Sequence, residues 1–325
     1  MSVIRSQVIG SGAYLPQKVL SNHELAKLVD TSDEWISNRT GIKRRHIVRE
    51  GEKTSDLAFE AAKAALADAK IGADELDLIV LATTTPDQTF PSVATNLQAR
   101  LGMTRGAAFD VQAVCSGFIY ALSVADSMIK TGQAKTVLLV GAETMSRLLD
   151  WSDRSTCVLF GDGAGALVLR AGEGKGDASD TGVLTSRLYS DGRLHDILYV
   201  DGGPSTTGTT GHLRMQGKEV FKHAVVNMAA AIEETARAAN VAVSDIDWIV
   251  PHQANQRILD GTARRLHLPL DRIISTIAEH GNTSAASVPL ALDVAVRDGR
   301  IKRGDLLLLE AMGGGLTWGA VLVRW

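Results

Sequence analysis

Three side chains that could support nucleophilic catalysis lie far apart along the chain: Cys115, His252 and Asn282. A thiolate is a strong nucleophile, and imidazole and carboxamide groups can donate hydrogen bonds to a developing negative charge. Cys115 directly precedes SGFIYALSVADSMIK, for which we predict a helix. We expect the N-terminus of that helix to lower the pKa of the thiol. The alternative is that Cys115 is a small buried apolar residue, as many cysteines are.

His252 and Asn282 each have a structural alternative as well. His252 follows WIVP, a predicted strand ending at Pro251, and α/β sheets present functional groups beyond the carboxyl ends of their strands. The polar residues Gln253, Asn255 and Gln256 come next, and buried polar groups need partners or a ligand. A structural histidine explains this run equally well. Asn282 precedes a predicted helix, where asparagine is also a good N-cap.

Of the remaining glycine and cysteine motifs, one could have a catalytic role and the others are predicted to be structural. MGGGLTWG, residues 312–319, contains three successive glycines that could aim backbone N–H groups at an oxyanion, although a sharp turn is the alternative. IGSGAYLP and FGDGAGAL lack the spacing of dinucleotide or phosphate loops. Cys157 lies in the strand-like run STCVLFGDGAGAL and is predicted to be buried and structural. No spacing of cysteine, histidine or carboxylates indicates a metal site.

An internal repeat indicates which elements would position these residues. LDLIVL and IDWIVP carry Asp77 and Asp247, which lie 170 positions apart, and each follows an alanine-rich amphipathic helix. The same offset sets CSGFIYAL against AASVPLAL, so the turns at Cys115 and Asn282 should face each other. TVLLVGAETM then falls on DLLLLEAMGG, and GAGALVLRA resembles TWGAVLVRW. Four matches in one order predict an α/β fold of two duplicated halves, residues 1–172 and 173–325, with the crossover and surface hairpins within residues 172–215.

Composition narrows the class of protein. The net charge of -3 argues against nucleic acid as the main partner. Two cysteines cannot build a disulfide framework, which favours a reducing compartment. The N-terminal stretch MSVIRSQVIGSGAYLP does not read as a signal peptide, and no run approaches the roughly 20 apolar residues of a membrane span. We therefore expect a cytoplasmic protein that does not span a membrane.

Seven motifs together resemble the β-ketoacyl-acyl carrier protein synthase III family, the condensing enzymes that initiate type II fatty acid synthesis. They are DEWISNRTGI, VCSGFIYAL, FGDGAGA, VFKHAV, PHQANQRI, GNTSAASVPLAL and GGGLTWG. The resemblance implies a thiolase-like, five-layered αβαβα fold and a homodimer. It also implies decarboxylative condensation of an acyl-CoA primer, expected to be acetyl-CoA, with malonyl-acyl carrier protein. No cofactor and no metal are implied, since coenzyme A and pantetheine thioesters are substrates.

The resemblance also implies roles for residues of this chain. Cys115 would accept the acyl group, His252 and Asn282 would stabilise the enolate, and the amides of Cys115 and Gly314 would form an oxyanion hole. For coenzyme A, Trp35 and Arg154 would sandwich the adenine, Arg39 would contact the phosphate side and Asn255 the pantetheine. The acyl pocket would include Phe90, Met312 and Leu316. The expected docking surface for the carrier protein comprises Gln253, Ala254, Asn255, Gln256, Arg257, Arg264 and Arg265, because carrier proteins are acidic.

Met312 and Leu316 depart from the family, which often has phenylalanine at both positions. A flexible methionine there predicts that primers longer than acetyl are accepted. Three alternative functions stay open from the sequence. A starter-unit synthase of secondary metabolism would use the same chemistry. A cysteine thioesterase or hydrolase is also compatible, since His252 follows Cys115 by 137 residues and Asn282 comes 30 later. The third alternative is a non-catalytic scaffold that binds acyl chains or carrier protein.

Overall fold

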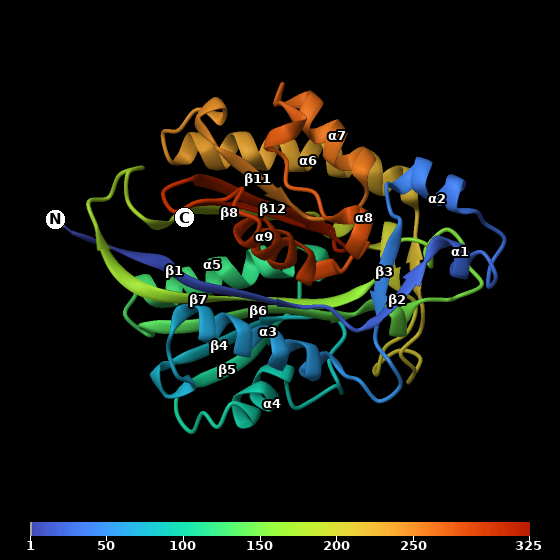
Figure 1. Cartoon of the computed structure of the whole chain (residues 1–325), viewed down its shortest axis with the longest axis horizontal. Helices are drawn as coiled ribbons and strands as arrows, with labels where there is room; N and C mark the ends of the chain where they lie inside the picture. The colour runs from blue at the N-terminus through green and yellow to red at the C-terminus, as the bar shows by residue number, and fades with distance from the viewer. Residues whose placement is uncertain (1) are drawn as a thin grey trace.

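Two mixed β-sheets enclose a central pair of helices in the computed structural model, which describes residues 2–325 (Figure 1). The central helices are α5 (Gly117–Lys130) and α9 (Ser287–Arg297). In the first sheet the strand order is β1 (Val3–Tyr14), β7 (Asp162–Gly174), β6 (Thr136–Thr144), β4 (Leu78–Ala82) and β5 (Ala107–Val111). In the second it is β11 (Trp248–Pro251), β12 (Leu306–Gly313), β13 (Thr317–Arg324) and β8 (Gly182–Ser190).

Further helices cover the outer faces of the sheets and complete five layers. Below the first sheet in Figure 1 lie α3 (Thr54–Ala69) and α4 (Val93–Arg100), and above the second lie α6 (Gly217–Ala238) and α7 (Gln256–Arg265). The αβαβα prediction is therefore confirmed. The smaller elements are α1 (Asn22–Leu25), α2 (Asp33–Thr40), α8 (Ile277–His280), the strand pair β2 (Lys18–Ser21) and β3 (Arg44–Ile47), and the hairpin β9 (Leu198–Val200) and β10 (Leu213–Met215).

The predicted repeat is visible in the backbone of the two halves. The elements β4, α5, β6 and β7 correspond to β11, α9, β12 and β13. Val114 and Ser284, 170 positions apart, both have positive φ, in equivalent 3-10 turns η2 (Val114–Ser116) and η7 (Ser284–Ala286). The Asp77 carboxylate accepts the backbone N–H of Thr136, and Asp247 accepts that of Leu306. The duplicated architecture of the fold is thus confirmed.

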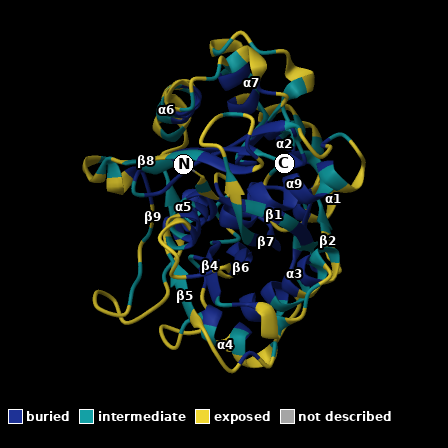
Figure 2. Ribbon diagram, turned by 90° about the vertical axis from the view of Figure 1, so that its left-hand side faces the viewer, coloured by how far each residue is buried: buried dark blue, intermediate teal, exposed yellow. Residues whose placement is uncertain are grey.

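The core lies between the two sheets and is shared by both halves. Figure 2 shows buried residues concentrated in the sheets, α5 and α9, with exposed residues on the outer helices and loops. One apolar cluster joins Phe118 of α5, Val288 of α9, Leu139 of β6 and Leu309 of β12. All nine residues of β6 are buried, because helices cover both faces of its sheet. The strands change sheet between Gly174 and Gly182, and a division into domains at residue 172 remains a prediction.

Of two local predictions, the surface hairpin in the crossover segment is present and the strand around Cys157 is not. The crossover segment contains β8 and the β9–β10 hairpin, whose connecting loop is exposed. The strand-like interpretation of the Cys157 run is wrong, because residues 151–159 form turns and β7 begins only at Asp162. Cys157 is nevertheless buried, as expected. No helix of residues 2–325 is long and apolar enough to cross a membrane.

Candidate active site

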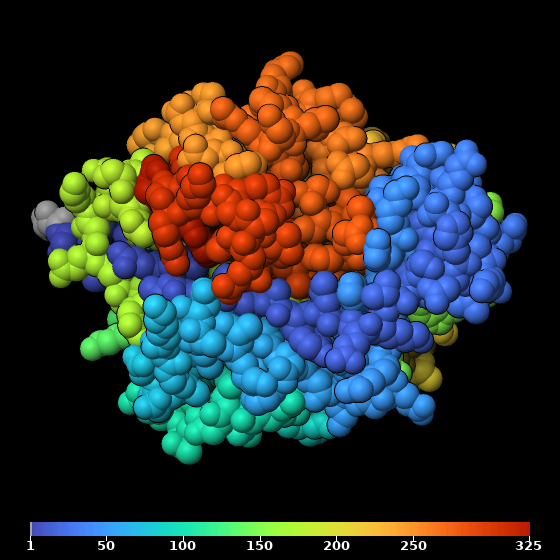
Figure 3. Space-filling view, in the orientation of Figure 1, coloured from blue at the N-terminus to red at the C-terminus, as the bar shows by residue number. Residues whose placement is uncertain are grey.

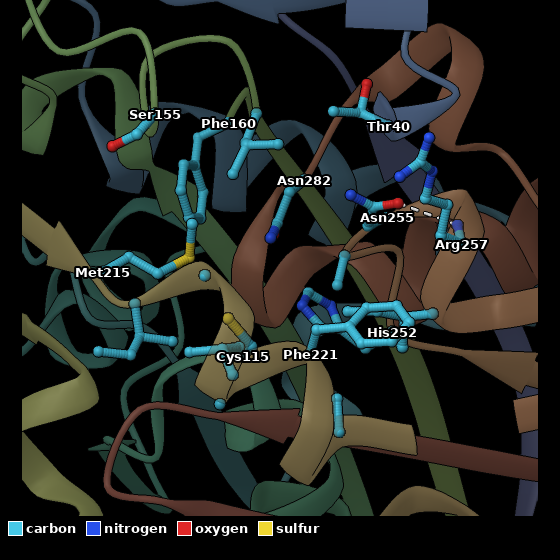
Figure 4. Close-up of a pocket in the computed structure, with 18 of the residues that line it drawn as sticks. Thr40, Cys115, Ser155, Phe160, Met215, Phe221, His252, Asn255, Arg257 and Asn282 are labelled. Carbon is cyan, nitrogen blue, oxygen red and sulfur yellow. Dashed lines mark hydrogen bonds between the residues drawn. The ribbon is translucent and has the colours of Figure 1, made fainter. Parts of the chain in front are cut away.

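A cavity of about 630 Å³ brings Cys115, His252 and Asn282 together (Figure 4). Cys115 lies in the turn η2 between β5 and α5, His252 directly follows β11, and Asn282 lies between α8 and η7. The loops after parallel strands of both sheets open to this cavity, as expected for α/β folds. Residues of both halves line the cavity. The space-filling view shows the two halves packed closely against each other (Figure 3).

Cys115 precedes the central helix as predicted, but the expected low pKa of its thiol is wrong. Burial raises the pKa of the Cys115 thiol to about 12. The negative charge of Glu143 adds to this rise. The thiol is therefore protonated at neutral pH before substrate binds. Attack on an electrophile must be coupled to loss of its proton.

The hydrogen bonds of His252 determine its protonation state. Ser287 Oγ lies 2.6 Å from His252 Nδ1 and also accepts the backbone N–H of Gln253 at 3.3 Å. When the Ser287 hydroxyl donates its hydrogen to Nδ1, the imidazole proton lies on Nε2. Burial lowers the pKa of His252 to about 3, so the ring is neutral at physiological pH. His252 can therefore act as a neutral N–H donor at the cavity.

Asn282 caps a turn with one atom and faces the cavity with another. Its Oδ1 accepts the backbone N–H of Ser284 at 2.9 Å. The backbone of Asn282 pairs with the Leu159–Gly161 segment through two hydrogen bonds of 2.9 Å. Figure 4 shows the side-chain nitrogen of Asn282 directed toward Cys115. The carbonyl oxygen of Asn282 is structural but caps a turn and not helix α9, which begins after Ala286. Its functional role as a donor stays a prediction.

The triple glycine packs directly against the turn that holds Cys115. A Cβ atom at Gly313 would lie 2.6 Å from the backbone nitrogen of Cys115, so no side chain fits there. Gly314 follows, and none of the hydrogen bonds found among residues 2–325 uses its backbone N–H. The amides of Cys115 and Gly314 thus belong to two backbone segments in close contact at the thiol. An oxyanion hole formed by this pair remains a prediction.

The four residues expected to bind coenzyme A all line the cavity. The guanidinium groups of Arg39 and Arg154 lie 4.8 and 5.2 Å from the ring of Trp35. A planar ring between Trp35 and Arg154 needs about 7 Å, so Arg154 must move aside for adenine to stack. Asn255 is the N-cap of α7 and also donates from Nδ2 to the carbonyl of Arg39 at 3.2 Å. Its side chain joins α7 to α2 at the mouth of the cavity.

The three residues expected in the acyl pocket have different positions relative to the cavity. Met312 lines the cavity. Leu316 does not: it is fully buried behind the wall, in a cluster with Met312 and Met228. Phe90 is 81% exposed and does not line the cavity of its own chain, so its role in the acyl pocket stays a prediction. Three further methionines line the wall and were not expected, since no local spacing connects them: Met145, Met215 and Met228.

The expected docking residues have different environments. Gln253 is buried, and its amide bonds the carbonyls of Pro251 and Ile274, so its assignment to a docking surface is wrong. Ala254, Asn255 and Arg257 line the cavity mouth, where Arg257 donates to the carbonyl of Asn38 at 2.9 Å. Gln256 is half-buried and bonded to Asp260 and Ser275. At the far end of α7, Arg264 and Arg265 are exposed.

Two buried carboxyl groups near the site have no counterpart in the sequence analysis. Glu143 accepts hydrogen bonds from three consecutive threonines and from the Ser284 hydroxyl, and burial raises its pKa to about 7. Glu310 on β12 is paired with Pro251 in the sheet, and its carbonyl accepts the backbone N–H of His252. Neither carboxyl oxygen of Glu310 has a hydrogen-bond partner among the described residues, and burial raises its pKa to about 8. Residues 2–325 contain no group of three or more histidine, cysteine, aspartate or glutamate side chains that could hold a metal ion.

Family models, sequence relatives and solved structures all point to the same family. The family described as "3-Oxoacyl-[acyl-carrier-protein (ACP)] synthase III" matches residues 109–192, and its C-terminal counterpart matches residues 236–325. A Rhodospirillum centenum protein named beta-ketoacyl-[acyl-carrier-protein] synthase III is 67% identical over 322 residues, 99% of each chain. The crystal structure of 3-oxoacyl-[acyl-carrier-protein] synthase III from Aquifex aeolicus has a TM-score of 0.92 at 50% identity, covering 98% of this chain and 100% of that one. The priming β-ketosynthase of the R1128 polyketide pathway has a TM-score of 0.91 at 34% identity, with 98% and 96% covered.

Proposed function

The chain belongs to the β-ketoacyl-acyl carrier protein synthase III family, and from this premise we propose how its cavity works. The enzyme condenses an acyl-CoA primer with malonyl-acyl carrier protein, releases coenzyme A and CO2, and starts fatty acid synthesis. The observation that carries this function is the single cavity shared by Cys115, His252 and Asn282. A polyketide starter-unit role is less well supported, because the R1128 enzyme is 34% identical and the R. centenum protein 67%.

In the first half-reaction, the sulfur of Cys115 attacks the thioester carbonyl of the acyl-CoA. The negative charge on the carbonyl oxygen is stabilised by the backbone N–H groups of Cys115 and Gly314. When the intermediate collapses, the C–S bond to coenzyme A breaks, and coenzyme A leaves as a thiol with the proton that Cys115 lost. The close packing of Gly313 on Cys115 supports this arrangement of the two amides.

In the second half-reaction, His252 Nε2 and Asn282 Nδ2 donate hydrogen bonds to the thioester oxygen of malonyl-acyl carrier protein. Loss of CO2 leaves an enolate, and these two donors stabilise its oxygen. The enolate carbon attacks the acyl-cysteine carbonyl, and Cys115 leaves as a thiolate that takes up a proton from solvent. Both donors are neutral, so their strength should vary little between pH 5 and pH 9.

Partners and location follow as further proposals. Acyl carrier protein and acyl-CoA are the proposed substrates, acetyl-CoA among the primers, and no step above requires another cofactor. A homodimer is proposed, and the exposed Phe90 is a candidate for its interface, because aromatic side chains are enriched in such interfaces. The cytoplasm is the proposed location, which agrees with two free cysteines.

Mass spectrometry of the protein after incubation with acyl-CoA thioesters of increasing length tests the proposal. We expect the added acyl mass on a peptide containing Cys115, and its transfer to malonyl-acyl carrier protein as 3-oxoacyl product. Cys115→Ser should abolish both, because a serine hydroxyl ionises far less readily than a thiol. Cys157→Ser is the matched control and should retain both. Acylation at Cys157, or thioester hydrolysis without consumption of malonyl groups, would contradict the proposal and favour a hydrolase.

A further inference from the structure

Arg45 on β3 carries a buried charge close to the candidate site. Its side chain is 0% exposed and is the largest fully buried side chain of the described chain. None of the ion pairs found among residues 2–325 includes Arg45. Burial lowers its pKa to about 10, which still leaves it charged at neutral pH. A buried charge without a carboxylate partner costs stability. We therefore expect a role of Arg45 in the backbone segments that its guanidinium binds.

The guanidinium of Arg45 joins three separate segments. It donates to the carbonyl of Leu20 on β2 at 3.2 Å and to Asn22 Oδ1 at 2.8 Å. Its other terminal nitrogen donates to the carbonyl of Val158 at 2.6 Å. Asn22 in turn donates to Asp33 at the start of α2, the helix that carries Trp35 and Arg39. Arg45 therefore connects the coenzyme end of the cavity with the segment around Val158.

The Val158 segment is also the support of Asn282. The backbone N–H of Asn282 donates to the carbonyl of Leu159, and the N–H of Gly161 donates to the carbonyl of Asn282, both at 2.9 Å. Phe160 and Asn282 form an isolated β-bridge and lie at the same cavity in Figure 4. Arg45 packs on both strands of this bridge, since Cβ atoms at Gly161 and Gly281 would lie only 3.0 and 3.2 Å from its own Cβ.

We infer that Arg45 is a positioning residue, which holds the Val158–Gly161 segment and thereby aims the side-chain amide of Asn282 at the substrate carbonyl. The inference rests on the proposed function of Asn282 as a hydrogen-bond donor to the enolate. Lysine cannot replace this arginine, because a single ammonium nitrogen does not span acceptors on both sides of the planar guanidinium. Small displacements of a catalytic group lower rates strongly, since the donor must meet the oxyanion at hydrogen-bond distance.

The test separates the two half-reactions in the variant Arg45→Lys. At saturating malonyl-acyl carrier protein we expect decarboxylation to slow by roughly 10- to 100-fold, with KM changed by less than about threefold. Acylation of Cys115 at saturating acyl-CoA should change by less than about threefold, because Cys115 lies on a different turn. In Arg45→Ala, millimolar guanidinium ion, far below denaturing concentrations, should restore part of the decarboxylation rate.

The neighbouring arginine on the same strand provides the matched control. Arg44 is half-exposed and paired with Glu279 at 2.9 Å, so Arg44→Lys should leave both half-reactions unchanged. If the Arg45 variants do not fold, Asn22→Ala provides the test, because it removes one acceptor of Arg45. Since Asn22 also holds the start of α2, both steps are measured at saturating substrate, and decarboxylation should slow more than acylation. Wild-type decarboxylation in Arg45→Lys, or in Asn22→Ala, overturns the inference. So does an equal loss of both half-reactions without guanidinium rescue. Failure of the unmodified protein to decarboxylate malonyl groups would instead overturn the proposed function.

Discussion

Two neutral hydrogen-bond donors, His252 and Asn282, share the cavity with the thiol of Cys115. His252 is neutral because burial lowers its pKa to about 3, and the Ser287 hydroxyl lies 2.6 Å from its Nδ1. Asn282 has one atom engaged in a turn and one facing the cavity. Two neutral donors can stabilise an enolate without first attracting a competing anion. Because the two side-chain atoms of Asn282 have different roles, removing only its N–H donor and removing the whole side chain should have different effects on activity and on the turn.

At Asn282, the isosteric change to aspartate separates these two roles. Asn282→Asp keeps the oxygen that accepts the Ser284 N–H but lacks the side-chain donor. We expect decarboxylation of malonyl-acyl carrier protein to fall by on the order of 10²–10³, as when an oxyanion donor is lost, and His252→Ala to behave alike. Acylation of Cys115 should be retained in both variants. Release of CO2 and the mass of the acyl-enzyme measure the two steps, and equal losses would contradict this division.

Glu310 gives the stability of the protein a defined pH dependence. Its pKa is raised from 4.5 to about 8 by burial, so the folded state binds the extra proton between these values. The stabilisation is complete below pH 4.5 and is lost as the pH rises through 8. Glu310→Gln should therefore be more stable than the unmodified protein at pH 9, by more than about 1 kcal/mol, in denaturant unfolding.

The acid side supplies the control for this measurement. His252 and His280 have pKa values lowered to about 3 and 4 by burial. Their contribution is present above pH 6.5 and is lost as the pH falls through these values. Below pH 4.5, where Glu310 is protonated in both the folded and the unfolded state, both proteins should therefore lose stability alike. An unchanged difference between them from pH 5 to pH 9 would mean that Glu310 does not titrate in this range.

At the scale of elements, α7 presents its arginines in two different settings. Arg257 lines the cavity mouth and bonds the Asn38 carbonyl, so Arg257→Glu should impair both acyl-CoA and carrier-protein substrates. Arg264 and Arg265 are exposed at the other end of the helix. If they attract the acidic carrier protein, Arg264→Glu should raise its KM about threefold or more and weaken the salt dependence, with acyl-CoA kinetics unchanged. Arg237→Glu, the same change on exposed α6, is the control. No effect of Arg264→Glu on KM would exclude this helix end from docking.

We expect the end of β12 to set the size of the acyl site through Met312. Met312→Phe adds volume at the cavity wall, so we expect acetyl to be retained and six- to eight-carbon primers to react more slowly. Leu316→Phe should instead overpack a buried cluster and cost about 1–3 kcal/mol of stability. Relative acylation rates over the primer series and thermal unfolding measure the two effects. Met103→Phe, in the core of the first half, is the control and should leave the primer order unchanged.

At the scale of the whole molecule, the duplicated halves depend on each other. The cluster between the sheets contains residues of α5 and β6 together with residues of α9 and β12. An isolated half would expose one face of its sheet and helix to water. We therefore expect residues 1–172 and residues 173–325, expressed separately, to lack cooperative unfolding by circular dichroism, whereas the full chain unfolds cooperatively. A cooperative transition in either half alone would show that it is an independent domain.

Local patterns were enough to predict the repeat, the strand that ends at Pro251, the helix after Cys115 and the meeting of three distant residues. Each of these depends on periodicity and order along the chain, which neighbouring residues determine. Local patterns fail at Cys157, because its apolar run is typical of a strand and yet folds as turns. A short apolar run does not distinguish these structures until its packing partners are known.

The sequence by itself thus determined the architecture and the identity of the three candidate catalytic residues. Only the tertiary structure decided the properties that come from contacts across the chain. Burial, together with Glu143, raises the pKa of the thiol that a helix terminus was expected to lower. Packing places Leu316 behind the cavity wall and leaves Phe90 outside. Arg45 reaches Val158, 113 positions away, because hydrogen bonding and desolvation depend on which atoms surround a group and not on its place in the sequence.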